Sequence, residues 1–119
     1  MNYVNLTLDC APEVKFKIQV ADNFLKRFLG LMGRFNLSPY TGLLLSPCNS
    51  IHMMFMRFPI DVIFYDKNYK VVKIATNLQP WTGISIAPGA KGAIELPAGT
   101  LEQLPIKALS SIKIEPAPS

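Results

Sequence analysis

The chain has 119 residues and a mass of 13.2 kDa, which is the size of one domain. Half of its residues are hydrophobic and only 17% are charged, a balance that excludes a disordered chain. No apolar run reaches the roughly 20 residues that span a bilayer, so we expect no membrane partner. The net charge is +4, but the twelve lysines and arginines are scattered along the chain. Nucleic-acid binders usually cluster such residues on one face, so we also expect no nucleic-acid partner.

The cysteines and the N-terminal residues bear on the cellular compartment. Cys10 and Cys48 lie far apart and match no CxxC spacing. Two thiols in a chain of this size do not form a disulfide framework. The first residues lack the basic start and the apolar stretch of a signal peptide. We therefore expect a cytoplasmic protein, or an exported one if a signal peptide precedes these residues in the natural chain.

The first third of the chain predicts two strands and a helix. Apolar and polar side chains alternate over the first twenty residues, which is the period of half-buried strands, and Ala11-Pro12 predicts the turn between them. After Asp22, apolar residues recur at the spacing of one helical face, and Gly33 suits the position that follows a helix. This spacing predicts one short helix over about residues 22–32.

The rest of the chain predicts short strands separated by proline, glycine and polar turns. The apolar run from Ile51 to Phe58 is typical of a central strand that is covered on both faces. Pro59 ends this run. The other expected strands are Leu43–Leu45, Ile60–Tyr65, Lys70–Ala75, Ala90–Leu96 and Ile112–Ile114. The sequence therefore predicts a mainly β fold, a small barrel or sandwich-like domain over residues 1–115 with one short helix, followed by a disordered tail at 116–119.

Four blocks of sequence stand out as motifs. They are Arg27-Phe28-Leu29-Gly30-Leu31-Met32, the block from Pro47 to Asp61, Leu78-Gln79-Pro80-Trp81, and Glu95-Leu96-Pro97-Ala98-Gly99. On these motifs the chain is identified as a member of the domain of unknown function 192 family, small β-rich domains of bacteria and archaea. The resemblance implies a compact β fold of barrel or clam-like shape and implies no activity. Family members usually carry Gly-Asp before the last strand, where this chain has Leu109-Ser110.

Charged residues within apolar strands are the first candidates for a site. Arg57, Asp61 and Glu95 each interrupt an apolar stretch, and a buried charge is too costly to leave without a partner. We expect Arg57 and Asp61 to pair with each other or with Glu95. One interpretation is an ion pair that fixes strand register across Pro59; the other is a polar cluster at a pocket, where Arg57 holds an anionic group. Arg27 lies opposite the apolar face of the predicted helix and either reaches this cluster or meets solvent.

His52 is the only histidine, which limits the catalytic schemes. A Cys48–His52 nucleophile pair needs a contact of about 3 Å, whereas four residues of regular strand span roughly 13 Å. The pair therefore requires a local bend; without it we expect a buried cysteine and a hydrogen-bonded core histidine. His52 with Met54 and Met56 also suits a soft copper ion, although methionines at this spacing are equally typical of a core.

Trp81 is the only tryptophan, and it either stacks on a ligand or covers the core. No Gly-rich phosphate loop, HExxH or GxSxG motif is present. The leading hypothesis is a non-catalytic domain, without cofactor, that binds a small molecule or peptide as a monomer or weak dimer. Its candidate ligand-binding residues are Arg27, His52, Arg57, Asp61, Trp81 and Glu95. The alternatives are a small hydrolase that uses Cys48 or Asp61 with His52, and a copper-binding protein that uses His52 with Met54 and Met56.

Overall fold

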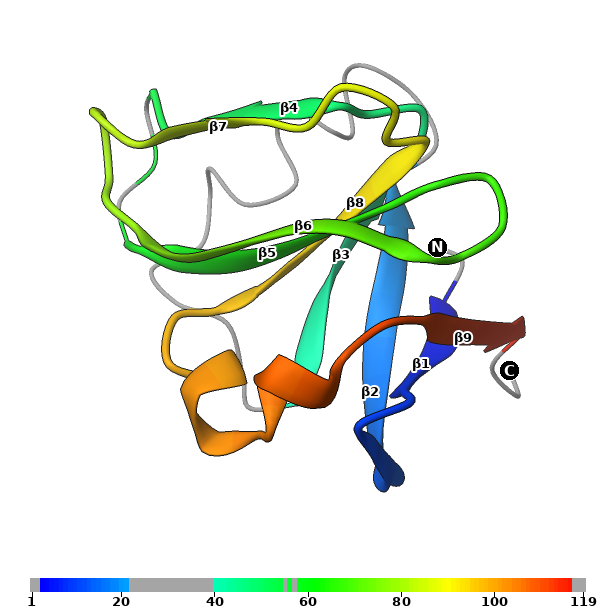
Figure 1. Ribbon diagram of the computed structural model, residues 1–119. Helices are drawn as coiled ribbons and strands as arrows, with labels where there is room; N and C mark the ends of the chain where they lie inside the picture. The colour runs from blue at the N-terminus through cyan, green and yellow to red at the C-terminus, as the bar shows by residue number, and fades with distance from the viewer. Residues whose placement is uncertain (1–2, 22–39, 55, 57, 117–119) are drawn as a thin grey trace.

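The computed structural model describes residues 3–21, 40–54, 56 and 58–116, and within them strands dominate the fold (Figure 1). The strands are β1 (Tyr3–Leu8), β2 (Ala11–Ala21), β3 (Thr41–Leu45), β4 (Ser50–His52), β5 (Ile60–Tyr65), β6 (Val71–Leu78), β7 (Ile84–Ile86), β8 (Gly92–Pro97) and β9 (Ile112–Pro116). Two short 3-10 helices, η1 (Leu101–Gln103) and η2 (Ile106–Ala108), precede β9. The predicted mainly β class is therefore confirmed.

Seven strands form one curled sheet in the order β6-β5-β8-β3-β2-β1-β9. β2 and β3 are parallel, and the other neighbours in this sheet are antiparallel. The two edge strands approach each other at one end, where Val71 N donates to Ser110 O and Ile112 N donates to Tyr69 O, both at 2.9 Å. These hydrogen bonds join the two edges of the sheet, which is therefore a half-barrel closed at one end.

β4 and β7 form a separate antiparallel ribbon, drawn above the curled sheet in Figure 1. The buried face of this ribbon packs on one face of the sheet, and we call this core the ribbon layer: Leu43, Cys48, Ile51, Met53, Met56, Phe58, Ile60, Val62, Phe64, Ala87 and Ala93 are among its members. The other face of the sheet encloses the curl layer, which includes Leu6, Leu8, Phe16, Ile18, Ile63, Tyr65, Ile94, Leu96 and Leu101. The sheet thus separates two apolar layers.

β5 lies between β6 and β8, and all six of its residues are buried. Its bounds agree with the prediction, because an apolar run bounded by Pro59 and a polar turn is typical of a fully buried strand. Alternate side chains enter the two layers, with Val62 in the ribbon layer and Ile63 in the curl layer. Gly42 on β3 allows the close approach of β8, because a Cβ atom there would lie 2.3 Å from the carbonyl oxygen of Glu95.

Two sequence predictions are corrected by the structure. The first turn lies at Asp9–Cys10, so that Ala11-Pro12 already begins β2. The central strand predicted from Ile51 to Phe58 is wrong: β4 ends at His52, and Met56 N donates to Met53 O at 3.0 Å in a turn. The β7 strand and both 3-10 helices were not predicted.

Some predictions concern residues that are not described. The helix expected at about 22–32, with Arg27, lies outside the described residues, and so do residues 117–119 of the expected tail. Within the described part of the chain, no helix has the length and apolar character needed to cross a membrane.

Candidate functional site

Asp61 is a fully buried carboxylate on β5 that binds two backbone amides. Its Oδ1 accepts a hydrogen bond from Asn77 N at 2.9 Å, and its Oδ2 accepts one from Leu101 N at 3.0 Å. The side chain therefore connects three segments: β5, the end of β6 and the first residue of η1. Charge-assisted bonds of this kind compensate for the cost of burying the carboxylate. This geometry gives Asp61 a structural role in the described fold.

Glu95 is buried on β8, but it faces the other layer. It lies opposite Leu43 and Val62, both in the ribbon layer, whereas Asp61 lies opposite Leu96, which is in the curl layer. Directly opposed residues of antiparallel strands point to the same face. The sheet therefore separates the two carboxylates, and they do not lie together in the polar cluster that the sequence suggested.

The predicted partners of these carboxylates are Arg27 and Arg57, and both arginines lie outside the described residues. Their pairing with Asp61 or Glu95 therefore stays a prediction. What the structure adds is that the two oxygens of Asp61 already have backbone partners.

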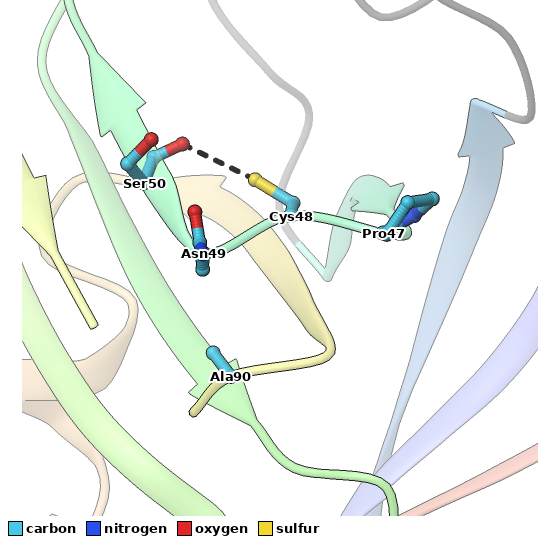
Figure 2. A pocket seen from close by; sticks show the side chains of 5 residues that line it. All are labelled: Pro47, Cys48, Asn49, Ser50 and Ala90. Atoms are coloured by element: carbon cyan, nitrogen blue, oxygen red, sulfur yellow. Dashed lines mark hydrogen bonds between the residues drawn. The ribbon is translucent and has the colours of Figure 1, made fainter. Parts of the chain in front are cut away.

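His52 is exposed on β4, opposite Ile84 of β7, so the expectation of a core histidine is wrong. Cys48 is buried in the ribbon layer, as expected, and its Sγ donates to the carbonyl oxygen of Ser50 at 3.2 Å (Figure 2). The imidazole thus lies on the outer surface and the thiol beneath it. Asp61 faces the curl layer, on the other side of the sheet from the ribbon layer that holds Cys48. The structure therefore does not bring together the residues of the hydrolase alternative.

A small hollow borders the Cys48 segment (Figure 2). Its volume is about 210 Å³, and it is lined by Pro47, Cys48, Asn49, Ser50 and Ala90. Small-molecule sites usually have volumes of about 300–1,000 Å³, so this hollow is below their range. Since its cysteine already has a carbonyl partner, nothing in this geometry distinguishes the hollow as a reaction site.

The copper alternative depended on a regular strand through His52, Met54 and Met56. The turn after β4 breaks that spacing: Met54 is exposed, whereas Met56 is buried in the ribbon layer. Among the described residues, no three His, Cys, Asp or Glu side chains come together in a way that could hold a metal ion.

Strand β7 exposes its apolar side chains on the outer face of the ribbon and buries its polar one. Ile84 and Ile86 of β7 are 63% and 55% exposed, whereas Ser85 between them is buried. Backbone bonds from Met53 N to Gly83 O and from Ala87 N to Asn49 O flank the ribbon. Because hydrogen-bonded and non-bonded pairs alternate in antiparallel strands, Ile84–His52 and Ile86–Ser50 are the closely spaced, non-bonded pairs of the outer face.

Two more exposed apolar side chains, Met54 and Trp81, lie close to the end of the ribbon in the chain. Trp81 is 58% exposed, so it does not cover the core, and its N donates to Met53 O at 2.7 Å. Its backbone adopts φ +70°, a left-handed conformation that is strained for a bulky residue. Met54, 54% exposed, follows Met53 directly. We call Met54, Trp81, Ile84 and Ile86 the ribbon patch.

Of these four residues, Trp81 is predicted from the sequence as a ligand-binding candidate and Met54 as a copper ligand. Neither isoleucine is among the predicted site residues. The sequence does contain a signal for them. Ile84-Ser85-Ile86 alternates with the period of a strand, and the residues around it include no carboxylate of the kind that usually lies on a solvated strand face.

Among the described residues, the ionisable groups with clearly shifted pKa values are Asp9, Cys10 and Tyr65, none of which belongs to the ribbon patch. Hydrogen bonds from the side chain and backbone of Ser110, and from Ser111, lower the pKa of Asp9 to about 2. Burial raises the pKa of Cys10 and of Tyr65, and for Tyr65 a hydrogen bond with Ser46 acts in the opposite direction. Asp9 joins the β1–β2 turn to Ser110 and Ser111, directly before β9, so its pKa shift reflects a structural contact. Ser110 belongs to the Leu109-Ser110 pair at which the chain departs from the usual family motif.

A larger hollow of about 520 Å³ opens elsewhere on the molecule. It lies between the first half of β2, Tyr40, and the turn and 3-10 helix that follow β8, with Phe16, Tyr40, Gly99, Thr100 and Gln103 among its lining residues. Its volume is within the range of small-molecule sites.

Comparison with known proteins agrees with this fold. The chain is a curled-sheet β domain, and residues 6–114 match the model of the DUF192 family, described as Uncharacterized ACR. It is 39% identical over 107 residues to a UPF0127 protein of Pyrococcus furiosus, an alignment that covers 86% of this chain and 90% of the relative. The chain therefore belongs to this family, as its motifs indicated.

Two crystal structures have the same fold. A protein of unknown function from Novosphingobium aromaticivorans gives a TM-score of 0.78 at 23% identity, over 95% of this chain and 83% of that one. A putative transcription regulator from Sinorhizobium meliloti gives 0.79 at 21% identity, over 97% and 92% of the two chains. At these identities the likeness concerns the fold alone.

Proposed function

We propose that this protein is a non-catalytic binding domain whose ribbon patch recognises an apolar, acidic segment of a partner polypeptide. The observation that carries the proposal is the burial pattern of β7, which is the reverse of the pattern expected from folding alone. Folding favours apolar side chains inside and hydroxyls outside, yet β7 buries Ser85 and exposes Ile84 and Ile86. Contiguous apolar side chains on a surface are typical of an interaction site.

The strain at Trp81 supports the same surface. A left-handed backbone costs on the order of 1–2 kcal/mol for a residue with a Cβ atom, and such strain concentrates at functional sites. The strained conformation accompanies an indole ring that is more than half exposed, next to the turn that carries Met54. Tryptophan is also among the residues that contribute most to binding energy at interfaces.

The partner contacts the face of the ribbon and not its edges. An extended peptide that adds to a sheet needs unused backbone groups along an edge strand. Two outward carbonyls of the ribbon are already occupied by side chains: Cys48 Sγ donates to Ser50 O, and Lys73 Nζ donates to Ile86 O at 3.1 Å. Recognition through the exposed side chains leaves these bonds intact.

The charge around the ribbon favours an acidic partner. Residues 46–60 and 76–94, which contain the ribbon and its flanking loops, include no aspartate or glutamate. Lys73 lies against the end of β7, and Lys91 follows the ribbon along the chain. A segment that combines apolar side chains with carboxylates therefore complements this surface in both shape and charge.

Selection from a random decapeptide phage library tests the proposal. Peptides that wild-type protein enriches are expected to combine apolar residues with Asp or Glu. When synthesised, they should shift the backbone NMR signals of Met54, Trp81, Ile84 and Ile86. The Trp81→Ala variant should lose affinity by about tenfold or more, because buried tryptophans usually contribute at least 1–2 kcal/mol.

The control is Tyr3→Ala, which removes an exposed aromatic side chain on β1 and should leave peptide affinity unchanged. The proposal is wrong if wild-type protein enriches no peptide, or if Trp81→Ala and wild-type protein bind the enriched peptides equally. Binding to anionic phospholipid vesicles without binding to any peptide would also overturn it, because the ribbon patch would then be a membrane contact.

A further inference from the structure

The 520 Å³ hollow beside Tyr40 is independent of the ribbon patch and has the composition of a small-molecule site. Its lining includes Phe16, whose side chain is almost fully buried in the curl layer. Tyr40 packs against Phe16 with ring centroids 5.8 Å apart and a tilt of 51°. Even so, Tyr40 is 54% exposed. The lining thus combines a buried aromatic side chain with an accessible one.

The walls of the hollow are held in place by bonds elsewhere in the fold. Leu101 N, at the start of η1, is fixed by the buried Asp61 carboxylate at 3.0 Å. The preceding turn is closed by two bonds to Pro97 O, from Thr100 N at 3.1 Å and Thr100 Oγ1 at 2.6 Å. Lys17 N donates to Tyr40 O at 2.8 Å. A site prepared in this way loses little conformational entropy when a ligand enters.

The positive φ of Tyr40 has a close counterpart elsewhere in the described part of the chain. Its φ of +60° is in the left-handed region, which a tyrosine adopts only when the surrounding structure imposes it. Tyr69 has nearly the same φ, +61°, and is 44% exposed, but it stacks on Tyr65 outside the lining of either hollow described above. The two tyrosines therefore share the strain and differ in whether the ring borders a hollow.

The polar groups of the hollow select the class of ligand. Glu13, Thr100 and Gln103 supply hydrogen-bond acceptors, and the Gln103 amide also supplies donors. Glu13 adds a carboxylate to this lining, which disfavours an anionic ligand. Neutral hydroxyl groups match both donors and acceptors, and a ring with an apolar C–H face matches the tyrosine ring.

We infer that this hollow binds a neutral sugar, a mono- or disaccharide whose C–H face packs on Tyr40 and whose hydroxyls bond Glu13, Thr100 and Gln103. The volume of 520 Å³ accommodates one or two pyranose rings. Binding here leaves the ribbon patch free, so the same domain is able to hold a sugar and a peptide segment together.

NMR titration of the complete 119-residue chain with glucose and with cellobiose tests this inference. We expect saturable shifts at the amides of Tyr40, Gly99 and Gln103, with no shift at Trp81 or Ile84. Affinity in the millimolar range is expected for so small a ligand. Because the expected signals belong to the hollow alone, failure of this proposal and failure of the peptide proposal are distinguishable.

The matched variants are Tyr40→Ala and Tyr69→Ala, which make the same substitution at the same backbone conformation. The first should weaken sugar binding by about tenfold, and the second should leave it unchanged. Gln103→Ala, on an exposed side chain, provides a second variant that should also weaken binding if Tyr40→Ala fails to fold. The inference is overturned if neither sugar gives saturable shifts up to about 100 mM, if choline or inorganic phosphate shifts these amides instead, or if a folded Tyr40→Ala or Gln103→Ala variant binds sugar as wild-type protein does.

Discussion

Replacing Asp61 with asparagine should destabilise the fold strongly, because both carboxylate oxygens accept backbone hydrogen bonds. Oδ1 binds Asn77 N and Oδ2 binds Leu101 N, and the side chain has no exposed surface. Asparagine has a single oxygen, so its NH₂ group must face one of these two N–H donors. One hydrogen bond is then lost, and the NH₂ group of the asparagine faces another N–H donor, either the buried Leu101 N or the partly buried Asn77 N.

The expected loss follows from these contacts. A hydrogen bond to a charged group contributes about 1.5–3 kcal/mol, and leaving a buried donor unsatisfied costs about 1–3 kcal/mol. Since these contributions overlap, Asp61→Asn should lower the free energy of unfolding by about 2–4 kcal/mol. Domains of this kind have a total stability of about 5–15 kcal/mol. The melting temperature should therefore fall by roughly 10 °C.

Urea denaturation followed by far-UV circular dichroism measures this change, and Asp66→Asn is the matched control. Asp66 also accepts two backbone amides, from Asn68 N and Lys70 N, but both bonds go to Oδ1 and the turn is exposed. Asparagine retains that oxygen, so we expect a loss below about 1 kcal/mol. If the free energy of unfolding of Asp61→Asn is within about 0.5 kcal/mol of the wild-type value, the two hydrogen bonds of the Asp61 carboxylate do not stabilise the fold, and the prediction is refuted.

Two further predictions concern Asp9 and Ser85. The pKa of Asp9 is lowered from its ordinary 3.8 to about 2, so its bonds to Ser110 and Ser111 stabilise the fold above pH 3.8, and this contribution is lost as the pH falls through 2. Asp9→Asn should accordingly lower the urea midpoint at pH 6 and have little effect near pH 2; an equal effect at both pH values would contradict this. Ser85 has a buried Oγ without a hydrogen-bond partner among the described residues, so Ser85→Ala should raise stability by about 1 kcal/mol in the same assay, and a loss of stability would show that the hydroxyl has a partner.

The sequence was informative where burial alone determines the structure. The bounds of β5 agree with prediction because six consecutive buried residues between a proline and a polar turn leave little choice. The β5–β6 hairpin and the turn at Pro97–Gly99 follow from their turn residues in the same way. The family could also be identified, because its motifs include the turns and the central block of the fold.

The structure of the run from Ile51 to Phe58 could not be predicted because some of its apolar side chains are buried in the core and another is exposed. Met53 and Met56 fill the ribbon layer from a turn, and unbranched methionine fits such irregular packing. Met54, between them, is exposed. A continuous apolar run therefore suggested a central strand, although the chain leaves the strand after three residues.

The separation of Asp61 from Glu95 was hidden for another reason. Both carboxylates interrupt apolar strands, and the sequence does not show which residues of two strands are opposite each other. The β5–β8 register places Asp61 opposite Leu96, and Glu95 opposite Val62, so one residue of offset assigns the carboxylates to different layers. The proposed polar cluster depended on that register and not on either residue alone.

Strand β7, which was not predicted, is the most informative difference between the sequence prediction and the structure. A strand selected only for folding would bury its two isoleucines, since each contributes about 1.5–3 kcal/mol when it is removed from water. β7 instead buries the hydroxyl of Ser85. Natural sequences depart from consistent patterning mainly at functional sites, where stability is exchanged for recognition. The inner face of the ribbon covers the ribbon layer, and under the proposed function its outer face is the surface that contacts the partner.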